Sequence, residues 1–388
     1  VLDNDSSTNA AVDGAVVTAE ASSNGSATDA SVDTGNTDVV FSQDGAAEVS
    51  VDTTNTELAL NLDGVNGDVT LDNANPASVA DLTVDASGAD SDFSLTAAAL
   101  VNLDVTANAD LNLAGSSLGN DTIKTVNVAG SGRVVLGDMR ETSINSFNAA
   151  NNTGGVVARI NTAMGSINGI EDYVFSAGND AVTLVEDDVN AAVTLGDGDD
   201  KLTLNDDSTT TPVEAITGGD GEDTLSMTDA SAIDTALSAD NTFASQVTGF
   251  ERLQINEAIA GGVSVDLGNL GFSEVITTGT SGSNTATLAN MANDGTVVLT
   301  AGQAAGSNLE VVVDGADSNA TDTLNLVTQV GAADIDAGPV TVNDVETINI
   351  TAEDTNVDED NDGDEFEIGD RDKSTLELTA DTAETITV

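Results

Sequence analysis

The chain has 388 residues and a formal net charge of −60, with 68 acidic and only eight basic side chains. This charge excludes nucleic acid as a partner, because contacts with phosphates need many Lys and Arg side chains. The absence of Cys and His excludes disulfide bridges, thiol chemistry, HExxH zinc proteases and Ser-His-Asp hydrolases.

The acidic side chains are mostly aspartate, with 49 Asp against 19 Glu. Aspartate favours turns and binds calcium, whereas glutamate favours helices. So much charge destabilises a compact fold unless cations neutralise it. Bound calcium would do so, and the alternative is a salt-adapted surface protein whose acids only hold water. Aromatic residues make up 2% of the chain, which suits a thin repetitive structure.

Short apolar-polar-apolar runs recur about every ten residues, as in Leu58–Leu62, Leu82–Val84 and Leu103–Val105. Turns rich in Asp, Asn and Gly bound these runs, so each predicts a short strand. Two folds fit this rhythm: a parallel β-solenoid with coils of about twenty residues, or an antiparallel sandwich. The flat rhythm and the scarcity of bulky side chains favour the solenoid.

We therefore expect an all-β chain of parallel β-solenoid, or β-helix-like, coils, with β-sandwich modules as the alternative. Four segments are predicted: a loosely structured β segment (1–57), a β-solenoid-like module (58–165), a module with glycine-rich turns and short helices (166–257), and a β-rich module with an acidic loop (258–388). No apolar run approaches the roughly 20 residues of a membrane span. No signal peptide is visible at Val1, and the strand pattern at the other end leads us to expect that the natural protein continues past Val388.

The glycine-rich stretch from Ser176 to Ser226 says most about function. Residues 218–226 match every fixed position of the nonapeptide GGxGxDxUx, and residues 195–203 miss only its first glycine. The sixth-position aspartates are Asp180, Asp200 and Asp223. The spacing between successive members of this set is close to one turn of a coiled β-structure.

Calcium explains the residue types in these turns. The ion takes six to eight oxygen ligands, and a glycine turn can supply several of them as backbone carbonyls. The aspartate adds charge, and the apolar residue two positions later starts an inward-facing strand. The alternative is a set of Asp/Gly turns that merely face solvent. The candidate calcium ligands of this stretch are Asp180, Asp197, Asp199, Asp200, Asp220 and Asp223.

These repeats resemble the RTX repeats of secreted bacterial proteins, and the resemblance implies that residues 166–257 form an RTX-type calcium-binding module. Together with the strand rhythm, the chain is similar to a calcium-dependent bacterial surface-layer (S-layer) protein with RTX-type repeats. The RTX resemblance covers about an eighth of the chain, and the S-layer resemblance covers most of it through weaker patterns. It implies Ca²⁺ as the cofactor and an extracellular location at the cell surface.

Two further acidic stretches are candidate calcium turns. Asp121 lies in a G-x-D-x-U sequence outside the main cluster and is equally well explained as a plain turn. Residues 358–364 begin like an EF-hand loop, although the twelfth position, Gly369, is not Glu and no helices are expected beside it. This loop would supply Asp358, Asp360, Asp362 and Asp364. The alternative is a solvated acidic hairpin tip.

An apolar-Glu-x-apolar-x-apolar frame recurs around Glu171, Glu251 and Glu346. We interpret it as the start of successive modules, and similar phrases recur in RTX-type S-layer proteins. Between Asp229 and Val247 helical spacing replaces the strand rhythm, which predicts one or two short helices with Asp229 as a candidate cap.

These patterns predict a non-enzymatic structural protein of an extracellular surface layer that assembles with copies of itself into a lattice or filament. The alternative is a segment of a large RTX-type adhesin or extracellular filament stiffened by calcium. A cell-surface polysaccharide is a further candidate partner, through a region that the sequence does not identify. An enzyme acting on acidic sugars would depend on Tyr173 and scattered arginines such as Arg159 and Arg252, and the net charge would repel its substrate.

Overall fold

The computed structural model describes most of the chain. The described residues are 10–12, 17–21, 30–34, 39–43, 46–53, 57–64, 66–70, 79–97, 99–118, 122–161, 172–185, 191–204, 214–237, 243–318, 321–330, 334–354 and 374–388. They divide into two compact units, one of residues 1–203 with 212–221 and the other of residues 204–211 with 222–388. The four predicted segments differ from this division and stay a prediction.

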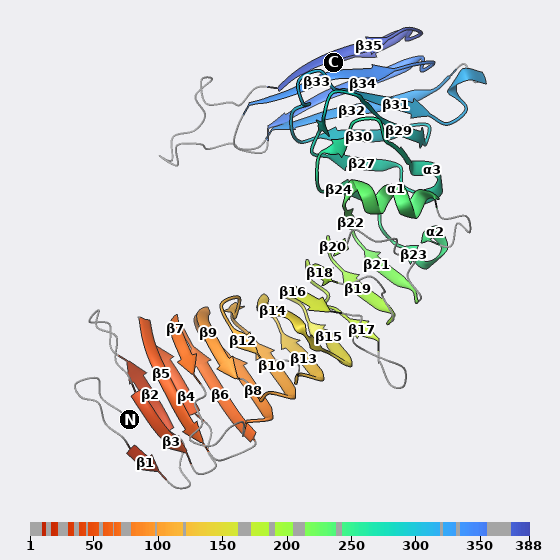
Figure 1. Cartoon of the computed structure of the whole chain (residues 1–388). Coiled ribbons are helices and arrows are strands. Elements are labelled where there is room, and N and C mark those ends of the chain that lie inside the picture. The colour runs from red at the N-terminus through yellow and green to blue at the C-terminus, as the bar shows by residue number, and fades with distance from the viewer. Residues whose placement is uncertain are drawn as a thin grey trace. The chain divides into compact units, whose positions relative to one another are not determined.

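The first unit is built from two parallel sheets whose strands alternate along the chain (Figure 1). One sheet contains β2 (Val17–Ala21), β4 (Val39–Gln43), β6 (Glu57–Asp63), β8 (Asp81–Ala86), β10 (Asn102–Ala107), β13 (Thr125–Gly130), β15 (Ser146–Asn152), β17 (Tyr173–Val174), β19 (Val193–Asp197) and β21 (Ile216–Asp220). The other contains β1 (Ala10–Val12), β3 (Ala30–Thr34), β5 (Ala46–Thr53), β7 (Asn66–Thr70), β9 (Ser91–Ala97), β11 (Leu111–Asn112), β12 (Ser117–Leu118), β14 (Val134–Ser143), β16 (Val156–Asn161), β18 (Ala181–Val185) and β20 (Lys201–Leu204). One strand from each sheet, with its two turns, makes one coil.

Equivalent side chains of successive coils stack directly on one another. Leu82 pairs with Leu103, and Leu103 pairs with Val126 of the following coil. The column continues through Phe147 to Tyr173. All of these side chains are buried, while the residues between them face outward. The period-two alternation therefore fills the space between the two sheets with aliphatic columns.

The second unit repeats this arrangement with parallel strands. One sheet contains β22 (Thr224–Met227), β24 (Arg252–Ile255), β27 (Glu274–Thr277), β30 (Gly295–Leu299), β32 (Thr323–Val330), β34 (Thr347–Asp354) and β36 (Thr385–Thr387). The other contains β26 (Ser264–Asp266), β29 (Thr285–Met291), β31 (Asn308–Val313), β33 (Ile335–Val342) and β35 (Ser374–Ala380). Two short strands, β25 (Ile259–Ala260) and β28 (Thr280–Ser281), pair with each other, and β23 (Val247–Thr248) is a further short strand.

Short helices occur in the predicted region and at two places where none was predicted. The helix α1 (Asp229–Leu237) and the single turn α2 (Phe243–Gln246) confirm the predicted region, followed by α3 (Leu267–Leu270) and a 3₁₀ turn η1 (Ala316–Ser318). The expected cap Asp229 is wrong. Thr228 precedes α1 and its hydroxyl oxygen accepts the Ser231 N–H at 3.1 Å. None of the described helices has both the length and the apolar character needed to cross a bilayer.

The fold is thus an all-β parallel solenoid with short helices, as predicted, and the antiparallel sandwich is not what the described strands form. Parallel coils hydrogen-bond only to their neighbours, so stability accumulates coil by coil.

Truncating one stacked core residue tests this packing. Leu103 is fully buried, so Leu103→Ala removes aliphatic contacts with both neighbouring coils and is expected to cost about 2–5 kcal/mol of unfolding free energy. Urea denaturation would measure the change. Thr194→Ser, at an exposed position between two buried residues of β19, is the control and should change stability by less than about 0.5 kcal/mol. Equal effects of the two substitutions would contradict the assigned register.

Candidate functional site

The RTX-like turns of the first unit stack backbone on backbone. Gly196 pairs with Gly219 and Asp197 with Asp220, and the Gly198 N–H donates to the Asp220 carbonyl at 2.9 Å. Gly219 has φ +135°, and a Cβ there would lie 1.7 Å from the Gly196 carbonyl oxygen. The glycines of the motif are therefore required by both backbone conformation and close approach.

The sixth-position aspartates all point inward. Asp180 and Asp200 are 2% exposed and Asp223 is fully buried. Each immediately precedes a strand, and the apolar residue two positions later is buried, as the motif predicted. A buried carboxylate needs hydrogen-bond partners or a counter-charge to offset its lost hydration.

Backbone and hydroxyl groups supply those partners at Asp180. Its Oδ1 accepts the Val156 N–H at 2.5 Å and the Ser176 hydroxyl at 2.7 Å, and its Oδ2 accepts the Ser176 N–H at 2.9 Å. Burial raises the pKa of Asp180 above its ordinary value, although the hydrogen bonds from Ser176 and Val156 act in the opposite direction. Asp200 in turn accepts the Asp180 N–H through Oδ1 at 2.8 Å.

Three of the predicted ligands lie on the outside of the turns. Asp197, Asp199 and Asp220 are exposed, and the Asp199 N–H donates to the Asn179 side chain at 3.0 Å. Within the described ranges, no three acidic side chains come together in a group that could hold a metal ion. The remaining candidates, Asp121, Asp358, Asp360, Asp362 and Asp364, lie outside the described residues.

The candidate ligands therefore differ in how well they suit calcium. Both carboxylate oxygens of Asp180 already accept hydrogen bonds, so this side chain does not fit a calcium ligand in the arrangement described. The exposed Asp197 and Asp220 lie on adjacent coils beside turn carbonyls, which are oxygen donors of the kind that calcium takes. Calcium at these turns stays a prediction.

The sequence reasoning missed the role of Glu251 and Glu346. The Oε2 of Glu251 accepts the Asp223 N–H at 2.8 Å, and that of Glu346 accepts the Asp322 N–H at 3.0 Å. Each glutamate thus reaches back to an aspartate one coil earlier. The signal was present as an acid followed by a polar and then an aliphatic residue, which the recurring Glu frame shares with the RTX-like turns.

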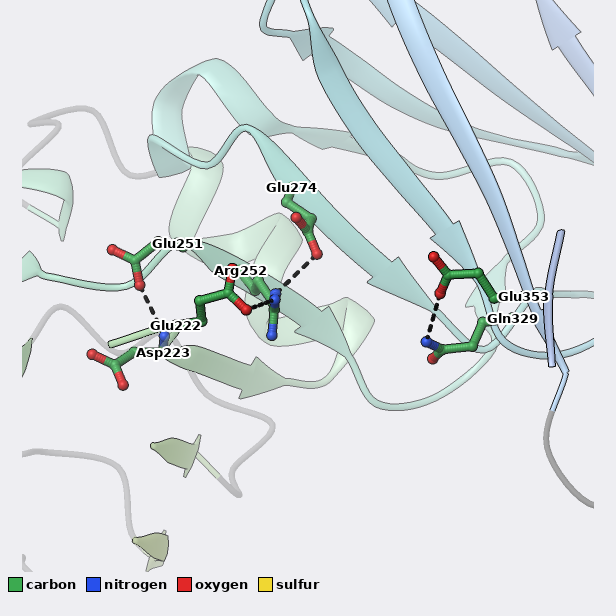
Figure 2. A network of polar contacts seen from close by, with 7 residues as sticks. All are labelled: Glu222, Asp223, Glu251, Arg252, Glu274, Gln329 and Glu353. Carbon is green, nitrogen blue, oxygen red and sulfur yellow. Dashed lines mark hydrogen bonds and ion pairs between the residues drawn. The ribbon is translucent and has the colours of Figure 1, made fainter. Parts of the chain in front are cut away.

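Arg252 forms a second contact that the sequence did not reveal. Its guanidinium bridges the carboxylates of Glu222 at 2.5 Å and Glu274 at 3.0 Å (Figure 2). Glu274 lies on the coil after Arg252 and is its paired residue, while Glu222 lies on the coil before it. The positive charge of Arg252 therefore lies between the two glutamates. Elsewhere on the same unit, the neutral side-chain amide of Gln329 donates to the carboxylate of Glu353 at 3.3 Å.

Comparison with known proteins does not identify a family. No protein-family model matches the chain, and no curated protein matches its sequence. The class that the fold defines is a parallel β-solenoid, and the RTX and surface-layer resemblance stays a proposal.

The close stacking of the turns predicts an unequal response to Gly→Ala substitution. Gly219→Ala places a Cβ against the Gly196 carbonyl and should lower the unfolding free energy by more than about 3 kcal/mol. Gly315→Ala is the control, because Gly315 also has a positive φ, of +71°, but nothing lies within 4 Å of a Cβ there. We expect about 1–2 kcal/mol for it, from backbone strain alone. Urea titration compares the two, and equal costs would count against the stacked turn geometry.

The raised pKa of Asp180 predicts the sign of a pH effect. The folded chain takes up a proton here at a pH where the unfolded chain does not. The contribution of Asp180 to stability therefore rises as the pH falls from 7 through the folded pKa, and becomes constant below about 3.9, the ordinary value for Asp. Asp180→Asn removes this titration. The wild type should gain stability relative to the variant between pH 7 and pH 4 in urea titrations. A difference that does not change with pH would contradict the raised pKa.

Proposed function

We propose that this chain is a structural protein of an extracellular surface layer, which assembles with copies of itself through calcium-neutralised acidic faces. The observation that carries the proposal is the acidity of in-register coils. Parallel stacking repeats exposed acids such as Asp197 and Asp220 along neighbouring coils, while the whole chain supplies only eight basic residues. Such faces repel one another unless cations lie between them.

The solenoid supports a mechanical role. Its strands hydrogen-bond to the coils before and after them, and the columns of buried aliphatic side chains run through successive coils. The same fold also suits the alternative, a segment of an RTX-type adhesin or extracellular filament. The two differ in organisation, because a surface-layer subunit forms sheets and an adhesin segment stays monomeric when calcium is present.

The side chains that an enzyme would need are engaged elsewhere, which supports a non-enzymatic role. Tyr173 is buried and its hydroxyl donates to the Ile144 carbonyl at 2.7 Å, and burial raises its pKa to about 12. Arg252 pairs with two glutamates, and Arg159 lies 3.7 Å from Asp138.

Imaging tests the proposal directly. Purified protein at fixed ionic strength should form ordered sheets with about 1–5 mM calcium, in the affinity range of extracellular modules, and disperse when chelator is added. Magnesium at the same concentration is the control, because it dehydrates reluctantly and bridges carboxylates less well. Calcium-dependent fibres or elongated monomers would favour the adhesin or filament alternative. Indifference to calcium in negative-stain images would overturn the calcium-dependent assembly.

A further inference from the structure

Three acid-containing dipeptides hold the preceding coil through the same two hydrogen bonds. At Glu346-Thr347 the carboxylate accepts the Asp322 N–H at 3.0 Å, and the Thr347 N–H donates to the Asp322 carbonyl at 2.9 Å. The backbone of Asp322 is thus held on both sides by two consecutive residues of the next coil. Asp322 itself is fully buried.

The same pair of bonds recurs in both units. Asp200 accepts the Asp180 N–H at 2.8 Å while the Lys201 N–H donates to the Asp180 carbonyl at 2.9 Å. In the second unit, Glu251 accepts the Asp223 N–H at 2.8 Å while the Arg252 N–H donates to the Asp223 carbonyl at 3.1 Å. Figure 2 shows the contact between Glu251 and Asp223.

These bonds fix register because they act where a strand begins. A buried backbone N–H must have an acceptor, and here a side chain of the next coil supplies it. Sliding one coil by a single residue would remove both bonds and would also turn the aliphatic columns outward. The acid and the aliphatic residue two positions later therefore select the same register.

These contacts join protein groups directly. Asp180 shows this most fully, because its oxygens accept only protein N–H and O–H groups, including the Val156 N–H of the coil before it. Asp180 is held by Asp200 and in turn holds Val156, so the contacts run through successive coils of the first unit.

We propose that Asp200-Lys201, Glu251-Arg252 and Glu346-Thr347 are register clamps that set the stacking of the coils without a bound ion. Asp200 of the RTX-like turns and the glutamates Glu251 and Glu346 then perform one task. Calcium, in the function proposed above, would act on the outward acids such as Asp197 and Asp220. The clamps do not depend on that function, because they act within a single chain.

Amide hydrogen exchange on the full chain, dispersed in chelator, tests the clamps. The Asp322 N–H should be protected in the wild type without calcium. Glu346→Ala removes its acceptor and should speed exchange at Asp322 by about tenfold or more. Glu346→Gln keeps an accepting oxygen and should stay within about threefold of the wild type. Glu353→Gln is the matched control. Glu353 lies in β34, the strand that begins directly after Glu346, and its carboxylate accepts from the Gln329 side chain, so this substitution should leave the Asp322 amide unchanged.

Two results would overturn the proposal. One is exchange of the wild-type Asp322, Asp223 and Asp180 amides at unprotected rates in chelator, with protection restored by calcium. The other is an Asp322 amide that stays protected in Glu346→Ala. If Glu346→Ala does not fold, exchange at the Asp322 amide in the wild type and in Glu346→Gln, both in chelator, still tests the proposal. Failure of sheet assembly leaves these measurements unaffected, so the two proposals fail separately.

Discussion

In-register parallel stacking is the constraint on which the rest of this structure depends. Each residue lies about 4.8 Å from its equivalents in the coils before and after it, so side chains of the same kind lie next to one another. Aliphatic residues gain from this arrangement, as the column through Leu82, Leu103 and Val126 shows. Acidic residues do not, because equal charges at that distance repel. A chain of net charge −60 can stack in this way only where its acids find donors or cations.

The chain meets this constraint by placing donors between acids. On the outer face of the first unit, Asn102 donates to Asp81 at 2.5 Å and Asn127 donates to Asp104 at 2.7 Å. An amide paired with a carboxylate on the next coil replaces repulsion with a charge-assisted hydrogen bond. Asn102 and Asn127 thus let Asp81 and Asp104 stack in register.

Much of the fold could be read from the sequence because its signal is local. The alternation in Leu58–Leu62 or Leu103–Val105 specifies a half-buried strand, and Gly219 and Gly221 specify a turn that no other residue fits. The helix at 229–237 was found because its spacing breaks that alternation. The candidate ligands Asp180, Asp200 and Asp223 were correctly placed before strands. The hydrogen bonds that Asp180 and Asp200 accept from Val156 and Asp180 could not be predicted, because each donor lies on the preceding coil.

Variable coil length explains why the contacts of Glu251, Glu346 and Arg252 were not predicted. Val157 pairs with Ala181, Gly295 with Leu324, and Thr347 with Thr385, so the sequence separation between paired residues increases from the first of these pairs to the last. No fixed period links such positions, so the sequence did not reveal that Glu251 and Glu346 make the same kind of contact as Asp200. The ion pairs of Arg252 could not be predicted for the same reason, because Glu222 and Glu274 become its neighbours only when the coils stack.

The contacts of Asp200, Glu251 and Glu346 share one direction along the chain. In every case the carboxylate belongs to the later coil and the N–H that it accepts belongs to the earlier one. In a polypeptide that emerges N-terminus first, whether from a ribosome or through an export channel, the start of such a strand has no acceptor until the following coil has appeared. The bonds at these positions therefore cannot form until the following coil has emerged.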